Sequence, residues 1–370
     1  MSRSQFLLIA LATTGLTTTV TALRRDVPAV PRAGSVTPAA AMLEPRSGHT
    51  ATLLPDGKVL IVGGMRRNQD FYRSAEVYDP ATGKFQAAGQ MTTARVGHIA
   101  ELLPSGKILI AGGWVGNGST DTAELYDPAT RKFSNISKMS ARRGRPSATL
   151  LSNGDVLIAG GADHTSPGGI ASAEVFHAST MTFEPVGSMH HGRISHTATL
   201  LDDGRIVIAG GRGESLTPSI EIYDPKTKQF TEAGSLLTAR YKHTAALLPD
   251  GQVLIAGGSD ERDWHGAMNN AEVYNPRTGK SQAVSPLNES RFKLPDEAVQ
   301  LSSGLVLISG GSTTVEIYDP KSEKFFVASG RMNDAWHFMT ATRLKDGSVL
   351  LAGGYPNNDQ ATPQTWIYRP

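Results

Sequence analysis

The chain repeats one pattern of apolar and polar positions seven times. In each copy, a short apolar stretch such as residues 50–54 is followed by a polar residue and a glycine, and then by a second apolar run such as residues 58–62. The second run ends on two adjacent glycines, and these pairs recur about every 48 residues, a period typical of repeat architectures. The pairs are Gly63-Gly64, Gly112-Gly113, Gly160-Gly161, Gly210-Gly211, Gly257-Gly258, Gly310-Gly311 and Gly353-Gly354. We therefore expect seven copies of one structural unit.

The pattern within a unit predicts four β-strands. Asp56-Gly57 and its equivalents join the first two apolar runs, and such pairs between β-branched runs favour a hairpin with a two-residue type I′ turn. The second run is apolar on both faces, which suits a strand packed between two neighbouring sheets. A third run, residues 75–80 in the first unit, ends at Asp-Pro, and a fourth begins near Phe85, seven residues after Tyr78. Each unit therefore predicts a four-stranded antiparallel sheet.

Seven such units predict an all-β fold, a seven-bladed β-propeller of four-stranded antiparallel blades. The units span about residues 46–91, 95–139, 143–189, 193–236, 240–287, 291–332 and 336–370 together with 34–42. The seventh unit stops after its third strand. Aligning residues 42–46 with residues 91–95 places Val36 where Phe85 stands, so residues 36–41 are expected to supply the missing outer strand. The last blade is then closed by an N-terminal strand.

Over residues 36–370 the chain resembles the Kelch repeat family, whose marks are the double glycine after the second strand and a spaced tyrosine and aromatic residue. It departs from the family in having phenylalanine where Kelch repeats usually have tryptophan as the second aromatic. The resemblance implies a β-propeller that binds ligands through the loops of one face. It leaves open whether the protein is an enzyme.

Two functions are compatible with the resemblance. The first is a module that binds a protein or glycan ligand on the loop face around the central channel. The second is a carbohydrate-active enzyme, similar to the exported bacterial Kelch propellers that mutarotate a sialic acid or other acidic sugars, or to propeller lyases. Galactose-oxidase-like copper radical chemistry needs a tyrosine crosslinked to a cysteine, and this chain contains no cysteine. We expect no metal and no other cofactor.

The net charge and the N-terminal residues indicate where the protein is located and which partners it has. The formal net charge is +2 and no basic run appears, which argues against nucleic-acid binding. Residues 1–22 predict a secretory signal peptide, with Arg3 before an apolar run at residues 6–12 that is too short to span a membrane. Residues 23–33 predict a flexible leader before a single propeller domain at residues 34–370. We expect an exported monomer, periplasmic or extracellular, without a membrane span.

Residues that recur in most units are interpreted as architectural. Six units carry an arginine before the first strand and six carry a glutamate in the third strand, whereas the seventh has Trp336 and Trp366 at these positions. Because both charges are lost together, we expect them to pair within a blade, with the remaining arginine donors available to an anion. The recurrent histidines are expected to make structural hydrogen bonds, although a ligand-lining role stays open; they are His49, His98, His196 and His243.

Residues that deviate from the repeat are the better candidates for a site. The loop at residues 259–270 is long and contains acids, bases and an aromatic residue, which suits sugar stacking or acid–base chemistry. An ordinary solvated loop would have the same composition. Glu101, Asp296 and Glu297 introduce charge into first strands. We predict a ligand-binding site between units five, six and seven and assign no catalytic residue; its members are Trp264, His265, Arg291, Asp296 and Trp336.

Overall fold

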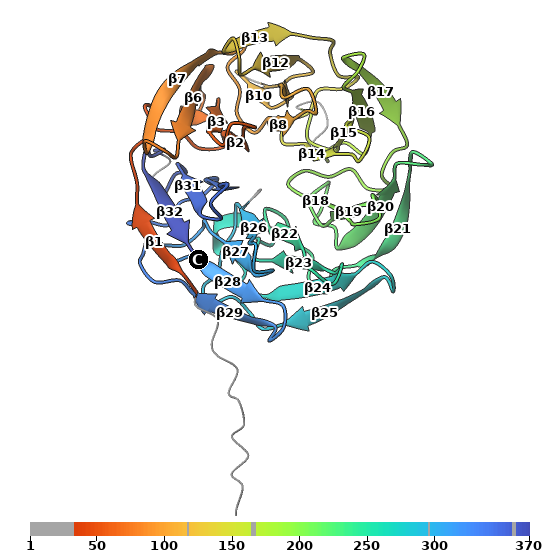
Figure 1. Ribbon diagram of the computed structural model, residues 1–370. Helices are drawn as coiled ribbons and strands as arrows, with labels where there is room; N and C mark the ends of the chain where they lie inside the picture. The colour runs from red at the N-terminus through yellow and green to blue at the C-terminus, as the bar shows by residue number, and fades with distance from the viewer. Residues whose placement is uncertain (1–32, 117, 164–167, 295–296, 357–359) are drawn as a thin grey trace, which may run out of the picture. The chain divides into compact units, whose positions relative to one another are not determined.

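The computed structural model describes residues 33–116, 118–163, 168–294, 297–356 and 360–370. The predicted signal peptide, nearly all of the predicted leader and Asp296 lie outside these ranges, so those predictions stay untested. The described chain contains seven four-stranded sheets that are arranged as a ring of blades, as predicted (Figure 1). Among the described residues no α-helix occurs, and none of their helical segments is long and apolar enough to cross a membrane.

Strands at the same place in each blade are equivalent. The innermost strands are β2 (Thr50–Leu53), β8 (Ile99–Leu102), β14 (Ser147–Leu150), β18 (Thr197–Leu200), β22 (Thr244–Leu247), β26 (Ala298–Gln300) and β30 (Thr340–Arg343). The second strands are β3 (Val59–Val62), β9 (Ile108–Ala111), β15 (Val156–Ala159), β19 (Ile206–Ala209), β23 (Val253–Ala256), β27 (Val306–Ile308) and β31 (Val349–Ala352).

The outer half of each blade follows the same order. The third strands are β6 (Ser74–Asp79), β12 (Ala123–Asp127), β16 (Ala173–His177), β20 (Ser219–Asp224), β24 (Ala271–Asn275), β28 (Glu316–Asp319) and β32 (Thr365–Arg369). The outermost strands are β7 (Lys84–Gln90), β13 (Lys132–Asn135), β17 (Thr182–Val186), β21 (Gln229–Ser235), β25 (Lys280–Val284), β29 (Lys324–Val327) and β1 (Ser35–Pro38). Loops add two small hairpins and a 3-10 helix: β4 (Met65–Arg67) with β5 (Asp70–Phe71), β10 (Trp114–Val115) with β11 (Gly118–Ser119), and η1 (Asp263–His265).

The ring closes through β1, which pairs antiparallel with β32. Val36 lies opposite Tyr368, just as Phe85 lies opposite Tyr78 in blade one. The predicted closure and its register are therefore confirmed, although the strand is shorter than expected. The N–H of Val36 also donates to the carbonyl of Ser329 (2.8 Å), which ties the closing strand to blade six.

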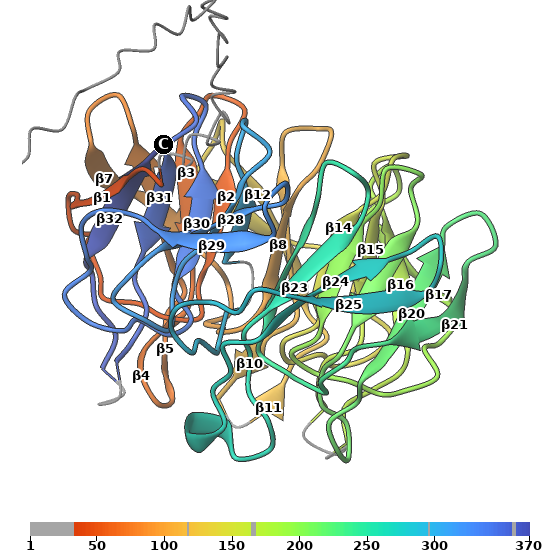
Figure 2. The same ribbon diagram turned by 90° about the horizontal axis from the view of Figure 1, so that it is seen from below.

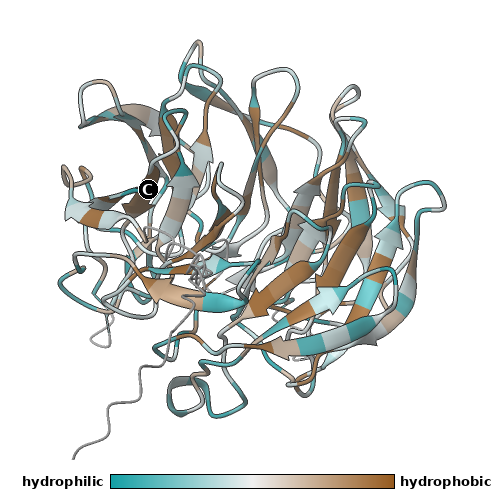
Figure 3. Ribbon diagram, turned by 60° about the horizontal axis from the view of Figure 1, so that its bottom comes forward, coloured by the Kyte–Doolittle hydropathy of each residue, from teal (hydrophilic) through white to brown (hydrophobic). Residues whose placement is uncertain are grey.

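The core lies between blades. Every residue of β3, for example, is fully buried, and one hydrophobic cluster combines Ile61 and Tyr78 of blade one with Leu350 of blade seven. Figure 3 shows hydrophobic residues concentrated along the inner strands and hydrophilic residues in the loops. Burying one such aliphatic side chain contributes about 1.5–3 kcal/mol, so these contacts hold adjacent blades together. The spaced aromatics pack within a blade, with the Tyr78 and Phe85 ring centroids 4.9 Å apart.

The first hairpin of each blade closes through a three-residue loop, so the predicted type I′ turn is wrong. In blade one the N–H of Leu54 donates to the carbonyl of Lys58 (2.8 Å), and the N–H of Gly57 donates to the carbonyl of Leu54 (2.9 Å). Gly57 has a φ of 89°, but Asp56 does not have a positive φ. A type I′ turn needs positive φ at both central residues, whereas a type I turn followed by a left-handed glycine makes the common three-residue loop.

Candidate functional site

One face of the ring carries both the loops after the glycine pairs and the segments that enter the innermost strands. These two sets of segments form backbone bridges in six blades: Ser47 with Met65, Val96 with Trp114, Gly144 with Ala162, Ile194 with Arg212, Tyr241 with Ser259, and His337 with Tyr355. We call this side the GG-loop face. Figure 2 shows that β4, β5, β10, β11 and the short helical turn all lie on it. Both sets of segments therefore lie on one side of the ring.

The recurrent arginines and glutamates pair within their own blades, as predicted. The guanidinium of Arg95 lies 2.9 Å from the carboxylate of Glu124, and neither side chain is exposed. The remaining pairs are Arg46–Glu76, Arg143–Glu174, Arg193–Glu221, Arg240–Glu272 and Arg291–Glu316. The expectation that these arginines keep donors free for an anion is wrong for Arg291. Its other donors bind the carbonyls of Gly310 and Thr314 and the hydroxyl of Thr314.

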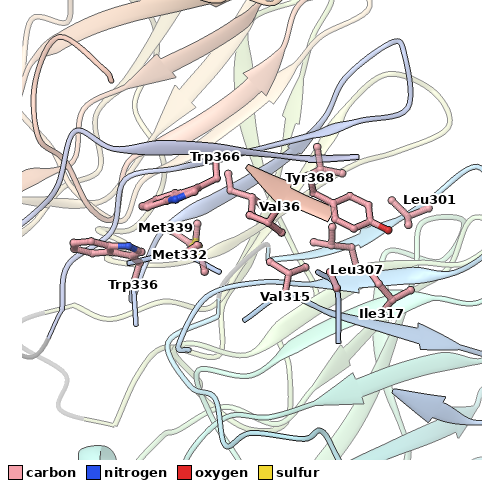
Figure 4. Close-up of a cluster of buried hydrophobic side chains, with 13 residues drawn as sticks. Val36, Leu301, Leu307, Val315, Ile317, Met332, Trp336, Met339, Trp366 and Tyr368 are labelled. Carbon is pink, nitrogen blue, oxygen red and sulfur yellow. The ribbon is translucent and has the colours of Figure 1, made fainter. Parts of the chain in front are cut away.

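Trp336 and Trp366 replace this ion pair in the seventh blade. Their ring centroids are 6.0 Å apart, and the two side chains are 6% and 2% exposed. Figure 4 shows both indoles beside Met332 and Met339 in the cluster that also contains Val36. Trp336 therefore packs in the core between blades six and seven rather than on the open face.

The recurrent histidines hydrogen-bond across blade boundaries, which supports the structural interpretation. Nε2 of His49 lies 3.1 Å from the hydroxyl of Thr340, and Nε2 of His196 lies 2.9 Å from that of Ser147. Burial and, to a smaller extent, the charge of the adjacent arginines lower the pKa of His49 and of His196 to about 3. These imidazoles are therefore neutral at ordinary pH.

A cavity of about 390 Å³ occupies the centre of the ring, and its wall is made by the innermost strands. The lining side chains are mostly small, because the same position carries alanine in every blade: Ala51, Ala100, Ala148, Ala198, Ala245, Ala298 and Ala341. Hydroxyl groups of residues such as Thr50 and Ser147 alternate with them along the wall. Glu101 is the one carboxylate residue among the described residues that line this cavity.

Seven residues in the left-handed conformation stand at equivalent positions on the GG-loop face, and all but Lys293 line the cavity; we call this ring the mouth. They are Gly48, Gly97, Arg145, Ser195, Lys242, Lys293 and Phe338, with φ between 51° and 61°. Backbone bonds link neighbours around the mouth, as when the N–H of Gly97 donates to the carbonyl of Gly48 and that of Arg145 to Gly97 (both 2.9 Å). Three cationic side chains thus stand at positions that glycine fills in the first two blades. Sequence reasoning missed them, although they directly precede the recurrent histidine position.

Aromatic side chains surround Lys293 at this mouth. The ammonium of Lys293 lies 3.5 Å from the ring centroid of Trp264 and donates to the hydroxyl of Tyr355 (2.9 Å). The rings of Phe292 and His337 contact the same indole at centroid distances of 5.0 and 4.8 Å. Lys293 is 4% exposed, whereas Trp264 is 37% exposed. The indole therefore covers the lysine and remains accessible to a ligand.

The long fifth loop is anchored to the mouth by Asp263. Its carboxylate accepts hydrogen bonds from the ammonium of Lys242 (2.6 Å) and the hydroxyl of Tyr241 (2.9 Å). Burial by itself raises the pKa of Asp263, but the hydrogen bond and charge of Lys242 outweigh it, so the pKa of this carboxyl is lowered. A carboxylate held in this way keeps Trp264 in place over Lys293.

The five predicted site residues fall into three groups. Trp264 and His265 are exposed in the fifth loop, and the structure brings Trp264 to the mouth of the cavity. Arg291 is buried in its ion pair with Glu316, and Trp336 is buried between blades six and seven. Asp296 lies outside the described residues. Whether any of the five binds a ligand stays a prediction.

Comparisons with known proteins bear on family and fold. The Kelch motif matches residues 45–92, 104–140, 193–237 and 240–288. No curated protein sequence matches this chain. Among solved structures, a fungal alcohol oxidase of the AA5 family in complex with copper superposes with a TM-score of 0.73 at 17% identity, covering 91% of this chain and 76% of that one. At this identity the likeness shows the fold alone. The described residues offer no group of three or more His, Asp or Glu side chains arranged to hold a metal ion.

The family follows from the repeat and from the structure together. The glycine pairs end the second strands, the Tyr–Phe pairs pack inside the blades, and the matched motif covers four of the repeats. The chain belongs to the Kelch-repeat β-propellers.

Proposed function

We propose that the protein is a binding module that holds its ligand on the GG-loop face, around the mouth of the central cavity. The observation that carries this is the position of Trp264. Among the described residues it is the one aromatic side chain in the set of exposed large hydrophobic residues, and it lies over a lysine at the mouth. An exposed aromatic beside polar donors is the usual anchor of a binding site.

A glycan is the ligand class that fits this arrangement best. An indole with one accessible side offers an apolar surface for a sugar ring, and hydroxyl groups lining the cavity offer hydrogen bonds. The cavity of about 390 Å³ falls within the range of small-ligand sites, roughly 300–1,000 Å³. A protein segment is the other ligand class, and it would anchor on the same tryptophan.

The test is to measure binding of oligogalacturonate, a neutral cello-oligosaccharide and a set of acidic peptides by calorimetry. Trp264→Ala is expected to weaken sugar binding at least tenfold while the melting temperature stays close to that of the parent. Val327→Ala is the matched control, because Val327 is an exposed hydrophobic residue on an outermost strand. Equal affinities of Trp264→Ala and Val327→Ala would refute the proposed location. Binding of the peptides alone would refute the glycan assignment.

A carbohydrate-active enzyme is the second candidate, and Glu101 is the observation that favours it. Glu101 lines the same cavity at a position where the equivalent residue of blade one is Thr52. A carboxylate in a cavity is a candidate general acid or base. Mutarotation or cleavage of an acidic sugar that Glu101→Gln abolishes, with sugar binding retained, would establish catalysis. Binding without any turnover would leave the binding module as the function.

Export from the cell is part of the proposal and rests on residues 1–22. The expected outcome is a mature protein whose N-terminus lies just after residue 22, recovered from the periplasm or the medium. Recovery of the uncleaved chain from the cytoplasm would contradict it.

A further inference from the structure

Arg145 differs from the recurrent arginines of the blades. The guanidinium of Arg143, two residues earlier, binds Glu174 and the carbonyls of Gly160 and Ser172. Arg145 lines the cavity, and among the described residues its guanidinium makes no hydrogen bond and no ion pair. A guanidinium has five N–H donors. All five are therefore left to water or to a ligand.

The side chain is nevertheless held in one place. The guanidinium lies over the ring of Phe338 at 4.1 Å from its centroid, so the side chain extends from blade three to blade seven across the mouth. Its stem passes Gly97, where a Cβ atom, if the residue had one, would lie 2.8 Å from the Arg145 side chain. The missing side chain at Gly97 thus makes room for the stem. Stacking on an aromatic ring leaves the edge of the guanidinium free for in-plane hydrogen bonds.

No described carboxylate pairs with this cation. The carboxylate whose charge acts on it is that of Asp263, which is already engaged by Lys242 and Tyr241. Burial lowers the pKa of Arg145, yet an arginine stays charged in proteins. A half-buried guanidinium that lines a cavity and has no carboxylate partner among the described residues favours an anionic ligand there.

We propose that the mouth of the cavity is an anion site in which Arg145 binds the carboxylate of a sugar acid. The guanidinium donates two parallel hydrogen bonds to the carboxylate oxygens, a geometry that arginine favours. Phe338 fixes the plane of the guanidinium, and the sugar ring lies toward the small side chains of the cavity wall. The position of the site at the mouth rests on the proposed function. The anionic nature of the ligand rests on the guanidinium of Arg145, which has no carboxylate partner among the described residues.

The repeat itself supplies the variants for the test. Blade four has Ser195 at the equivalent position, and blades five and six have Lys242 and Lys293, all in the same left-handed backbone conformation. Arg145→Ser removes the charge and Arg145→Lys keeps it, and the backbone accommodates both residue types. Arg142→Ser is the matched control, because Arg142 is exposed and lies three residues earlier.

The probes are D-galacturonate and D-galactose, which differ by the carboxylate, titrated by calorimetry and thermal shift into the full mature chain. The parent is expected to bind galacturonate at least tenfold more tightly than galactose. Arg145→Ser should bind galacturonate at least tenfold more weakly than the parent, Arg145→Lys should lie between them, and Arg142→Ser should match the parent.

Each failure is distinguishable. If Arg145→Ser binds galacturonate as the parent does, or if the parent binds neither sugar, the anion site is refuted. Acidic peptides that bind in place of galacturonate would overturn the sugar-acid assignment. If Trp264→Ala binds galacturonate normally while Arg145→Ser does not, the anion site stands and the aromatic anchor of the proposed function fails.

Discussion

The indole of Trp336 packs against that of Trp366 at the two positions where each of the other six blades has an Arg–Glu ion pair. One contact in the blade is therefore built in two chemically different ways. An ion pair of this kind needs both partners, because a buried charge without its partner is strongly unfavourable. The tryptophan pair meets the same need by removing both charges.

This relationship predicts non-additive mutations. Trp336→Arg or Trp366→Glu alone should destabilise the protein by about 3–5 kcal/mol, because each buries an unpaired charge. The double variant should be destabilised by clearly less than the sum of the two, as measured by urea unfolding. The matched control is a double-mutant cycle on a native ion pair, made of Arg95→Gln, Glu124→Gln and the variant that carries both substitutions. Additive free energies in both cycles would contradict pairing within the blade.

Because β1 closes the ring, we expect substitutions at two neighbouring residues of this strand to differ strongly in their effect on stability. Val36 is buried and Thr37 is exposed, because successive side chains of a strand point to opposite faces. Val36→Asp should destabilise by about 3–5 kcal/mol, while Thr37→Asp should change the unfolding free energy by less than about 0.5 kcal/mol. Deleting residues 34–43 should lower the melting temperature severely. An unchanged melt of that deletion would show that the ring closes in another way.

Because of the buried histidines, we expect the folded state to lose stability at acidic pH. The folded-state pKa of His49 is about 3, below the unfolded value of 6.5, so below pH 6.5 the unfolded chain binds a proton that the folded chain does not. Stability is then lost as pH falls from 6.5 toward 3, by about 1.4 kcal/mol per pH unit for each such histidine. His49→Gln should flatten this slope in urea unfolding between pH 4 and 7. Identical slopes for parent and His49→Gln would contradict a neutral buried imidazole.

On the outer part of blade three, we expect protonation of His177 to stabilise the protein, so that its contribution to stability falls as pH rises. Hydrogen bonds with Glu184 and Asp155 raise the pKa of His177 above its usual value of 6.5. Its stabilising effect is fully present below pH 6.5 and is lost as pH rises through the raised pKa. His177→Gln should therefore lower the melting temperature at pH 5.5 more than at pH 9. A difference that is the same at both pH values would show that protonation of His177 plays no part.

Comparison of the seven repeats predicted the architecture well, because equivalent positions repeat the same physical constraint. The apolar second strands, the register of Val36 opposite Tyr368 and the pairing of arginine with glutamate inside a blade were all visible as patterns across units. The turn type was misjudged because Asp-Gly occurs in both two-residue and three-residue hairpin loops. Only the backbone conformation of Asp56 distinguishes them.

The candidate site depended on the closed ring. The sequence indicated that Trp264 stands in an unusual loop, but not that Lys293, from the next blade, lies under its indole. It likewise could not show that Trp336 is buried against Trp366.

The sequence by itself determined the number of blades, their strands and the closure of the last blade, because these follow from local periodicity and from residues that recur at equivalent positions. Only the tertiary structure decided where charge gathers. Arg145 and Phe338 are almost two hundred residues apart in a chain of 370, and the repeat position that they share carries five different residue types in the seven repeats. They meet because closing the ring brings all seven left-handed residues to one mouth, where a cation of one blade reaches the aromatic ring of another.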